Sequence, residues 1–144
     1  MSAESFKAYL GRVQTAVKQK SDGIQLAALK SLESEHKTRI FNDGKTTSGI
    51  SIGYYTQKYG DYREDNDRQA QYVDLEFYGN LIKAIQVGKS QGRNVYGFIN
   101  TYQRRIAEGN TKRFKRSIFT VSQTEAKDLS RRVGKGFQIA IRNV

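Results

Sequence analysis

The sequence predicts an α+β fold in which N-terminal helices lead into a small antiparallel β-sheet with a hairpin, and a capped helix closes the chain. Three observations support this prediction. Apolar residues repeat at helical spacing near both ends of the 144-residue chain. The segment Gln91-Gly92-Arg93-Asn94 lies between two apolar segments, a pattern typical of a β-hairpin. Ser122, followed three residues later by Glu125, has the spacing of a helix capping box.

These signals divide a single domain, residues 1–144, into three regions. We expect a helical region over 1–42, a loop and β-sheet region with a short helix over 43–121, and a C-terminal helix over 122–142. A chain of this length usually forms one domain with a modest core.

The first 40 residues have the pattern of two amphipathic helices. One apolar stripe has spacings of four, three and four, and consists of Phe6, Leu10, Val13 and Val17. The turn residues Ser21-Asp22-Gly23 predict a break, with Asp22 as the N-cap of a second helix that continues to Ile40. His36 lies on the apolar face of that second helix, so we expect a half-buried, hydrogen-bonded histidine rather than a catalytic one.

Between the terminal helices, turn-forming residues alternate with short apolar segments. We expect short strands over 50–55 and 72–77. The polar, charged stretch over 64–69 predicts an exposed loop between them.

The second half of this region contains the hairpin. A short helical turn over 81–85 precedes strands over 84–89 and 94–99. A helix over 101–108 follows, and Gly109-Asn110 is expected to end it.

The C-terminal helix is predicted by an apolar repeat behind the capping box. The repeating positions are Leu129, Val133, Phe137 and Ile141. Gly134 and Gly136 weaken this helix by about 1 kcal/mol each relative to alanine.

The charge of the chain is strongly positive and unevenly placed. Lys and Arg number 25 against 14 Asp and Glu, a net charge of +11. Residues 1–72 contribute 11 − 9 = +2, and residues 73–144 contribute 14 − 5 = +9. The densest basic cluster consists of Arg104, Arg105, Lys112, Arg113, Lys115 and Arg116. Such a cluster indicates an anionic partner, either nucleic acid or an acidic protein, and the sequence leaves both open.

Composition gives little support for enzyme chemistry. The absence of cysteine excludes disulfides and thiolate zinc sites, and a single histidine disfavours Ser-His-Asp arrangements. No phosphate-binding loop pattern occurs. We expect no enzyme activity, no cofactor and no metal. We also expect a soluble intracellular protein, since neither a signal peptide nor a membrane-spanning run is evident.

One acidic cluster and one group of tyrosines each have two interpretations. The acidic cluster is typical of a solvated loop and consists of Asp61, Glu64, Asp65 and Asp67. The alternative is a metal-dependent nuclease that uses the three aspartates Asp61, Asp65 and Asp67. Aromatic residues so close together favour packing or a subunit interface over base stacking. The candidate interface residues are Tyr54, Tyr55, Tyr59 and Tyr62, with Arg93 on the hairpin.

A series of short motifs then appears in a fixed order. It comprises Ile-Phe-Asn-Asp-Gly over 40–44, Gly-Ile-Ser-Ile-Gly-Tyr-Tyr over 49–55, and Val-Asp-Leu-Glu-Phe-Tyr-Gly-Asn-Leu over 73–81. This order resembles the tail-completion proteins of tailed bacteriophages, also described as virion-morphogenesis, minor tail or neck proteins. The resemblance covers about residues 36–130, and Tyr78 departs from it where the family has threonine. The motif positions are Phe41, Gly44, Gly53, Tyr54, Asp74, Leu75, Gly79 and Leu81.

This resemblance implies a structural protein of the virion neck or tail end. It implies a ring of copies, hexameric or dodecameric, at the head–tail junction, in contact with connector, tail-tube or other tail proteins and with the DNA in the channel. The implied location is the virion, and the host cytoplasm during assembly, with no membrane partner. The alternative is a free nucleic-acid-binding module that uses the basic cluster with nearby tyrosines as stacking platforms.

Overall fold

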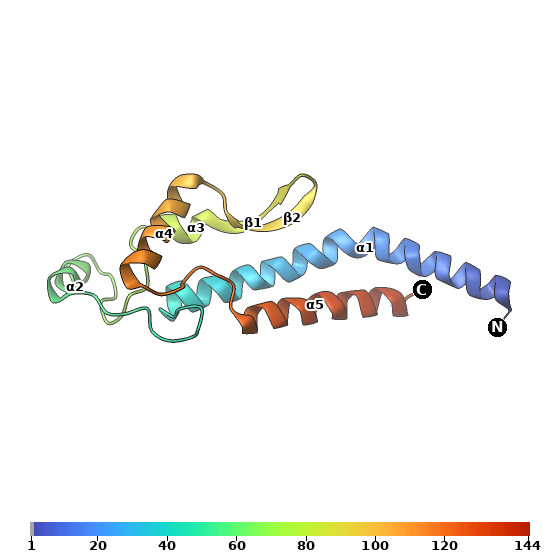
Figure 1. The fold of residues 1–144 in the computed structure, drawn as a ribbon, viewed down its shortest axis with the longest axis horizontal. Helices are drawn as coiled ribbons and strands as arrows, with labels where there is room; N and C mark the ends of the chain where they lie inside the picture. The colour runs from blue at the N-terminus through green and yellow to red at the C-terminus, as the bar shows by residue number, and fades with distance from the viewer. Residues whose placement is uncertain (1) are drawn as a thin grey trace.

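The computed structural model describes residues 2–144, which form an elongated α+β molecule (Figure 1). The predicted fold class is therefore confirmed. Two long antiparallel helices, α1 and α5, lie side by side, the β-hairpin lies along α1, and the short helices gather at one broad end. The elements are α1 (Ala3–Lys37), the π-helical turn η1 (Thr38–Asn42), α2 (Gln57–Glu64), α3 (Asn80–Ala84), β1 (Ile85–Ser90), β2 (Arg93–Phe98), α4 (Thr101–Phe114) and α5 (Gln123–Arg142).

Helix α1 continues without interruption for 35 residues, about 50 Å at 1.5 Å per residue. The predicted break at Ser21-Asp22-Gly23 is wrong, and Asp22 caps no helix. The Asp22 carboxylate instead accepts hydrogen bonds from Lys89 Nζ at 2.9 Å and from Asn94 Nδ2 at 3.0 Å. These turn-forming residues therefore fasten the helix to the hairpin. Packing on two sides of α1 outweighs the roughly 1 kcal/mol that a helical glycine costs.

A single wide turn, η1, ends this long helix and directs the chain into the core. The Asp43 N–H donates to the Thr38 carbonyl oxygen at 2.9 Å, and Phe41 is buried within the turn. Gly44 follows with φ +60°, and a Cβ at this position would lie 2.7 Å from the Val73 carbonyl oxygen. Only glycine fits this conformation and this close approach.

The two strands predicted over 50–55 and 72–77 are wrong. Both segments are irregular, and they meet through isolated bonds such as the one from the Val73 N–H to the Gly53 carbonyl oxygen, 2.9 Å long. Leu75 has φ +56°, which ends any extended ladder at that point. The segments behave as a pair of packed loops rather than as part of the sheet.

Helix α2 forms in the tyrosine-rich stretch, where the sequence pattern indicated no helix. The exposed loop predicted over 64–69 is confirmed for residues 65–68, whereas Glu64 ends the helix and Gln69 is half-buried. The inward-facing residue of α2 is an arginine, so the hydrophobic pattern gave no signal for it.

Strands β1 and β2 form the predicted antiparallel hairpin, shifted by one residue from the expected bounds. Ile85 lies opposite Phe98, and pairing continues to the tip. The turn dipeptide Gln91-Gly92 has φ of +50° and +75°, the geometry of two-residue turns that match strand twist. Within residues 2–144 this hairpin is the whole sheet, and the predicted helical turn before it is α3.

Helix α4 continues through its predicted stop at Gly109-Asn110. The Asn110 side chain donates to the Ile106 carbonyl oxygen at 3.1 Å, so this polar group is satisfied within the helix. The helix ends where Lys115 adopts φ +53°. Helix α5 begins as predicted, and its capping box is complete.

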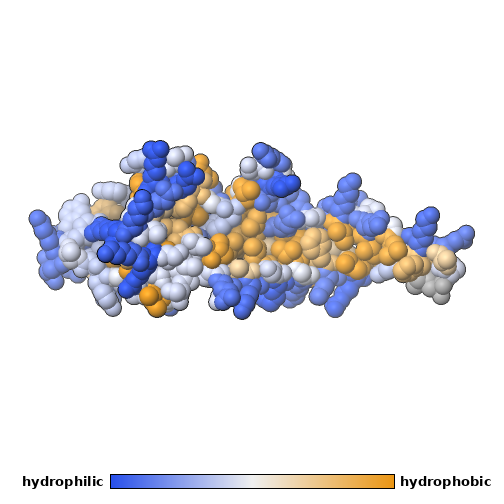
Figure 2. All heavy atoms as spheres, viewed as in Figure 1, coloured by the Kyte–Doolittle hydropathy of each residue, from blue (hydrophilic) through white to orange (hydrophobic). Residues whose placement is uncertain are grey.

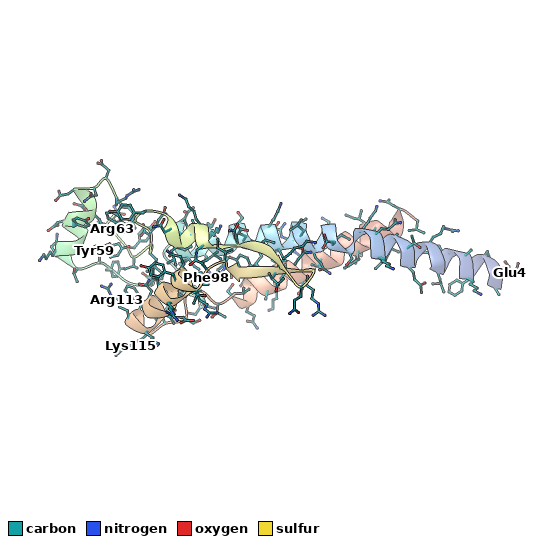
Figure 3. The ribbon with its side chains drawn as sticks, turned by 90° about the horizontal axis from the view of Figure 1, so that it is seen from above. Glu4, Tyr59, Arg63, Phe98, Arg113 and Lys115 are labelled. Carbon is teal, nitrogen blue, oxygen red and sulfur yellow. The ribbon has the colours of Figure 1, made fainter. Side chains whose placement is uncertain are left out.

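The core lies at the broad end, where the irregular segments meet the short helices and the base of the hairpin. Its members are Ile40, Phe41, Ile52, Val73, Leu81, Ile85, Ala107 and Ile118. Helix α4 contributes Ala107 to this cluster, and Figure 3 shows α2 and α4 on different sides of the broad end.

Candidate functional site

The six basic residues identified in the sequence lie on α4 or directly after it, and all six are exposed. Figure 2 shows strongly hydrophilic side chains over this part of the surface. Arg104 and Lys112 line a groove beside α4, whereas Arg113 lines another hollow next to α2 residues. One helix therefore brings the cluster together and divides it between two surfaces.

The first of these surfaces, which we call the α4 groove, has a volume of about 400 Å³. Phe98 and Phe119 pack edge to face with ring centroids 5.7 Å apart and give the groove apolar walls. The cationic lining residues are Arg104 and Lys112; Glu108 Oε1 lies 3.6 Å from Arg104 Nε. The other lining residues are Ala107, Thr111, Ser117 and Thr120.

Arg39 holds the chain segment that closes this groove. Its guanidinium donates to the carbonyl oxygens of Ile118 at 3.1 Å and Thr120 at 3.0 Å, and its Nε donates to Glu125 Oε1 at 2.7 Å. Burial raises the pKa of Glu125, but the hydrogen bonds from Arg39 and from the Ser122 N–H outweigh burial and hold that pKa below its usual value. The end of α1 is thereby fixed to the start of α5.

His36 lies beside this ion pair, and the prediction of a hydrogen-bonded histidine is confirmed. Its Nδ1 lies 2.6 Å from the Tyr96 hydroxyl, and the side chain is buried rather than half-buried. The pKa of His36 is lowered to about 4, chiefly by burial; the Glu125 carboxylate opposes the shift and the Arg39 guanidinium adds to it. The imidazole is therefore neutral near pH 7 and lies inside the fold.

The candidate interface residues do not form one surface. Tyr54 is 77% exposed. Tyr59 and Tyr62 stack with centroids 6.0 Å apart, and Tyr62 stacks on Phe77 at 5.6 Å, so three rings form an ordered, partly exposed ladder. Arg93 lies on the hairpin, beside the turn at its tip.

Tyr55 belongs to a buried network that the sequence pattern did not indicate. The Arg63 side chain is 2% exposed, and its guanidinium donates to Asp74 at 3.0 Å and to the carbonyl oxygens of Gln69 and Glu76. The Tyr55 hydroxyl donates to the same carboxylate at 2.8 Å, and its ring lies 4.5 Å from the guanidinium carbon. Burial and then this hydrogen bond raise the pKa of Tyr55. The network fixes α2 against the irregular segments.

The acidic cluster lies on α2 and just after it, with all four carboxylates exposed. Within residues 2–144 none of the four takes part in an ion pair, although Asp61 accepts a hydrogen bond from Gln57 Nε2 at 2.7 Å. That part of the chain also holds no group of three or more His, Asp or Glu placed to bind a metal ion. These four groups form a negatively charged corner of the molecule.

Most of the motif positions that carry the family resemblance are buried or lie at turns with positive φ. Phe41 and Leu81 are core residues. Gly44 and Gly79 adopt positive φ, and Gly79 directly precedes α3. Tyr54 is the exposed member of the set.

The N-terminal end of α1 extends past the end of α5 (Figure 1). Asn143 and Val144 line a hollow together with residues of the 8–19 segment, so α5 ends opposite that segment. Near this end of α1, the side chain of Phe6 is 52% exposed and that of Leu10 is 42% exposed. Figure 2 shows a hydrophobic band that continues along the helical part toward this end.

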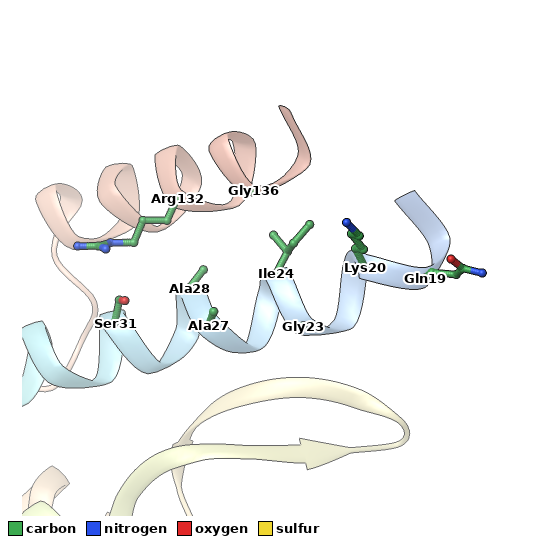
Figure 4. A pocket seen from close by; sticks show the side chains of 9 residues that line it. All are labelled: Gln19, Lys20, Gly23, Ile24, Ala27, Ala28, Ser31, Arg132 and Gly136. Atoms are coloured by element: carbon green, nitrogen blue, oxygen red, sulfur yellow. The ribbon is translucent and has the colours of Figure 1, made fainter. Parts of the chain in front are cut away.

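Helices α1 and α5 approach closely at Gly136. A Cβ on this residue would lie 2.6 Å from Ile24 Cγ2. The two residues border a hollow of about 480 Å³ between the helices, shown in Figure 4. Arg132 also lines it and donates to Glu35 Oε1 at 3.0 Å.

Comparisons with models of protein families, with curated proteins and with solved structures returned no match. Among residues 2–144, none of the helices combines the length and apolar character needed to cross a membrane.

Proposed function

We propose that this chain is a structural subunit of the neck or tail end of a tailed-phage virion. It acts by assembly, as a ring of copies at the head–tail junction that contacts connector or tail proteins around the DNA path. The order of motifs over residues 36–130 supports this role. Its motif glycines lie at positions of positive φ, which other residues rarely adopt.

The observation that carries the proposal is the incompletely covered apolar stripe of α1. Phe6 and Leu10 lie on the same helix face as the apolar residues further along α1, near its N-terminal end, where α5 no longer covers the helix fully. Contiguous apolar surface of this kind marks a protein interaction site when it stays exposed in one copy. A subunit of a larger assembly covers it with a neighbour.

The charge of α4 is compatible with the same role. Residues 101–116 contain six Lys and Arg and one Glu, a local charge of 6 − 1 = +5. In a ring around DNA, these groups face either the phosphate backbone or an acidic neighbour.

Complementation of a phage that lacks this chain tests the proposal. Without the chain we expect heads and tails that fail to join, seen by negative-stain electron microscopy, and loss of plaques. Phe6→Ser/Leu10→Ser is expected to complement at least about a hundredfold less well than the wild type, because apolar anchors dominate interfaces. Lys7→Ser/Gln14→Ser changes two exposed polar residues of the same helix and serves as the matched control.

Two results would contradict this role. One is a deletion phage whose particles assemble and infect normally. The other is equal complementation by the apolar variant and by its polar control, with circular dichroism showing that both are folded.

A second candidate function is nucleic-acid binding through α4. Within residues 2–144, Arg104 is the one member of the basic cluster within ion-pair distance of a carboxylate. Duplex DNA binding is then expected to weaken with salt, with about −0.9 in the log–log slope for each phosphate contacted. Arg105→Glu/Arg113→Glu makes that slope less negative by roughly two units if both residues contact phosphates. Absence of binding at low salt would remove this candidate.

A further inference from the structure

Two surfaces at the broad end carry charges of opposite sign, and each contains aromatic residues. The α4 groove has apolar walls from Phe98 and Phe119, with Arg104 and Lys112 exposed along its lining. The second surface, which we call the α2 corner, consists of the exposed residues Asp61, Tyr62, Glu64 and Asp65.

The aromatic residue of the α2 corner is held in place before any partner binds. Tyr62 is 49% exposed, and it stacks against Phe77 with an interplanar angle of 9° and against Tyr59 with an angle of 29°. A ring that is already ordered loses little conformational entropy when it enters a groove. Carboxylates flank it on both sides in the sequence.

The two surfaces cannot meet within one molecule. Figure 3 shows α2 and α4 on different sides of the broad end, and a separate hollow lined by Tyr59, Phe77 and Arg113 lies between them. The buried contact of Arg63 with Asp74 fixes α2 in that place. The complementary partner is therefore available on a second copy of the same chain.

We propose that the α2 corner of one copy docks into the α4 groove of the next copy. Tyr62 lies against Phe98 and Phe119, and the carboxylates of Glu64 and Asp65 face Arg104 and Lys112. The contact joins two different surfaces, so it repeats from copy to copy and closes into a ring when the rotation between copies permits. This inference rests on the proposed role as an assembly subunit and identifies the contact between its copies.

Charge reversal on each side, followed by mixing, tests the contact. Arg104→Glu/Lys112→Glu reverses the groove, and Glu64→Lys/Asp65→Lys reverses the corner. The lysines of the corner variant stand at the C-terminal end of α2, where positive charge suits the helix dipole, so folding is preserved. Lys127→Glu/Lys135→Glu on the exposed surface of α5 changes the net charge as much as the groove variant and is the matched control.

Sedimentation velocity measures the outcome. Each reversed variant is expected to self-associate at least about tenfold more weakly than the wild type and the control, because like charges then face each other. An equimolar mixture of the two variants is expected to regain association, since every contact again pairs opposite charges. Separate, non-associating species in the mixture would overturn the proposal, as would wild-type protein that stays monomeric at millimolar concentration.

A photo-crosslinking residue provides a second, positional readout. Benzoylphenylalanine in place of Tyr62 is expected to crosslink to peptides over 98–120 of another copy. Crosslinks to any other segment would overturn the proposal even if copies associate. If the groove variant loses duplex DNA binding without any change in self-association, DNA occupies the α4 groove and the proposal is overturned.

The two proposals fail in distinguishable ways. If the groove variant complements the phage deletion as well as the wild type, the copy-to-copy contact is wrong while the neck or tail role stands. If copies crosslink as expected but the deletion phage assembles normally, the contact is right and the phage role is wrong.

Discussion

The Nδ1 atom of His36, at the end of α1, lies 2.6 Å from the hydroxyl oxygen of Tyr96 on β2. This bond joins the long helix to the hairpin inside the fold. Beside it, Arg39 in η1, directly after α1, donates to Glu125 on α5. Two neighbouring contacts thus fix the C-terminal end of α1, the hairpin and α5 to one another.

His36 predicts an acid-sensitive fold. Its pKa is about 4 in the folded chain against about 6.5 when unfolded, so the unfolded state binds the proton first. This contribution to stability is complete above pH 6.5 and is lost progressively between pH 6.5 and 4. From pH 7.5 to 5.0 we expect the free energy of unfolding to fall by about 2 kcal/mol through this residue. Urea titrations at several pH values measure it, and His36→Gln, which does not titrate, should lack that component.

Gly136 and Gly134 are expected to respond oppositely to alanine. At Gly136 the new Cβ would meet the stiff, branched side chain of Ile24 at 2.6 Å, so Gly136→Ala should destabilise the protein by about 1–3 kcal/mol. At Gly134 nothing lies within 4 Å, and Gly134→Ala should stabilise it by about 1 kcal/mol through helix propensity. Thermal melts of both variants measure these changes in stability. The double variant Gly136→Ala/Ile24→Ala removes the clash and should recover part of the stability lost in Gly136→Ala.

The Arg63–Asp74 pair predicts strong non-additivity. Arg63→Leu leaves the buried Asp74 carboxylate without its cation and should cost about 3–5 kcal/mol, as should Asp74→Ala. The double variant should cost clearly less than the sum of the two, because neither charge then remains unpaired. Additive losses in urea unfolding would show that the two residues act independently.

The two serine caps predict a difference between the long helices. Ser122 belongs to a capping box next to Arg39, and Ser122→Ala should cost about 1–2 kcal/mol. Ser2 caps the start of α1, whose first turn is exposed to solvent, so Ser2→Ala should change global stability by less than about 0.5 kcal/mol. Equal effects in chemical denaturation would mean that the end of α1 is packed as firmly as the start of α5.

Local signals predicted the hairpin and the C-terminal helix well. The turn at Gln91-Gly92 needs positive φ at both residues, and the capping box at Ser122 satisfies its own backbone groups. Both features depend on residues within three positions of each other. The fold class follows from them together with the helical spacing at the two ends.

Tertiary contacts explain where the sequence pattern was misleading. Asp22 was predicted to cap a helix from its neighbours in the sequence. Its actual partner, Lys89, lies 67 residues away, so local spacing could not indicate it. The segments over 50–55 and 72–77 looked like strands because their apolar residues enter the core, yet they lack a ladder. Arg63 gave no core signal because an arginine is rarely buried. The only sign in the sequence that Arg63 is buried was its place in a polar stretch with several aromatic residues.

The surfaces proposed for assembly were only partly visible in the sequence. The density of Lys and Arg after residue 103 located the basic cluster, but not its division between two sides of α4. The groove needs Phe98 and Phe119, which come from β2 and from the segment before α5. Their proximity depends on the fold as a whole.

The pairing of α1 with α5 has a consequence during protein synthesis. Glu35 and Arg132, which meet across the two helices, are 97 residues apart in the chain. At about 5–20 residues per second, a ribosome makes the second partner roughly 5–20 s after the first. Throughout that interval the nascent helix has no cover for its apolar face. Premature termination before the last 20 residues would therefore release a chain prone to chaperone capture and aggregation.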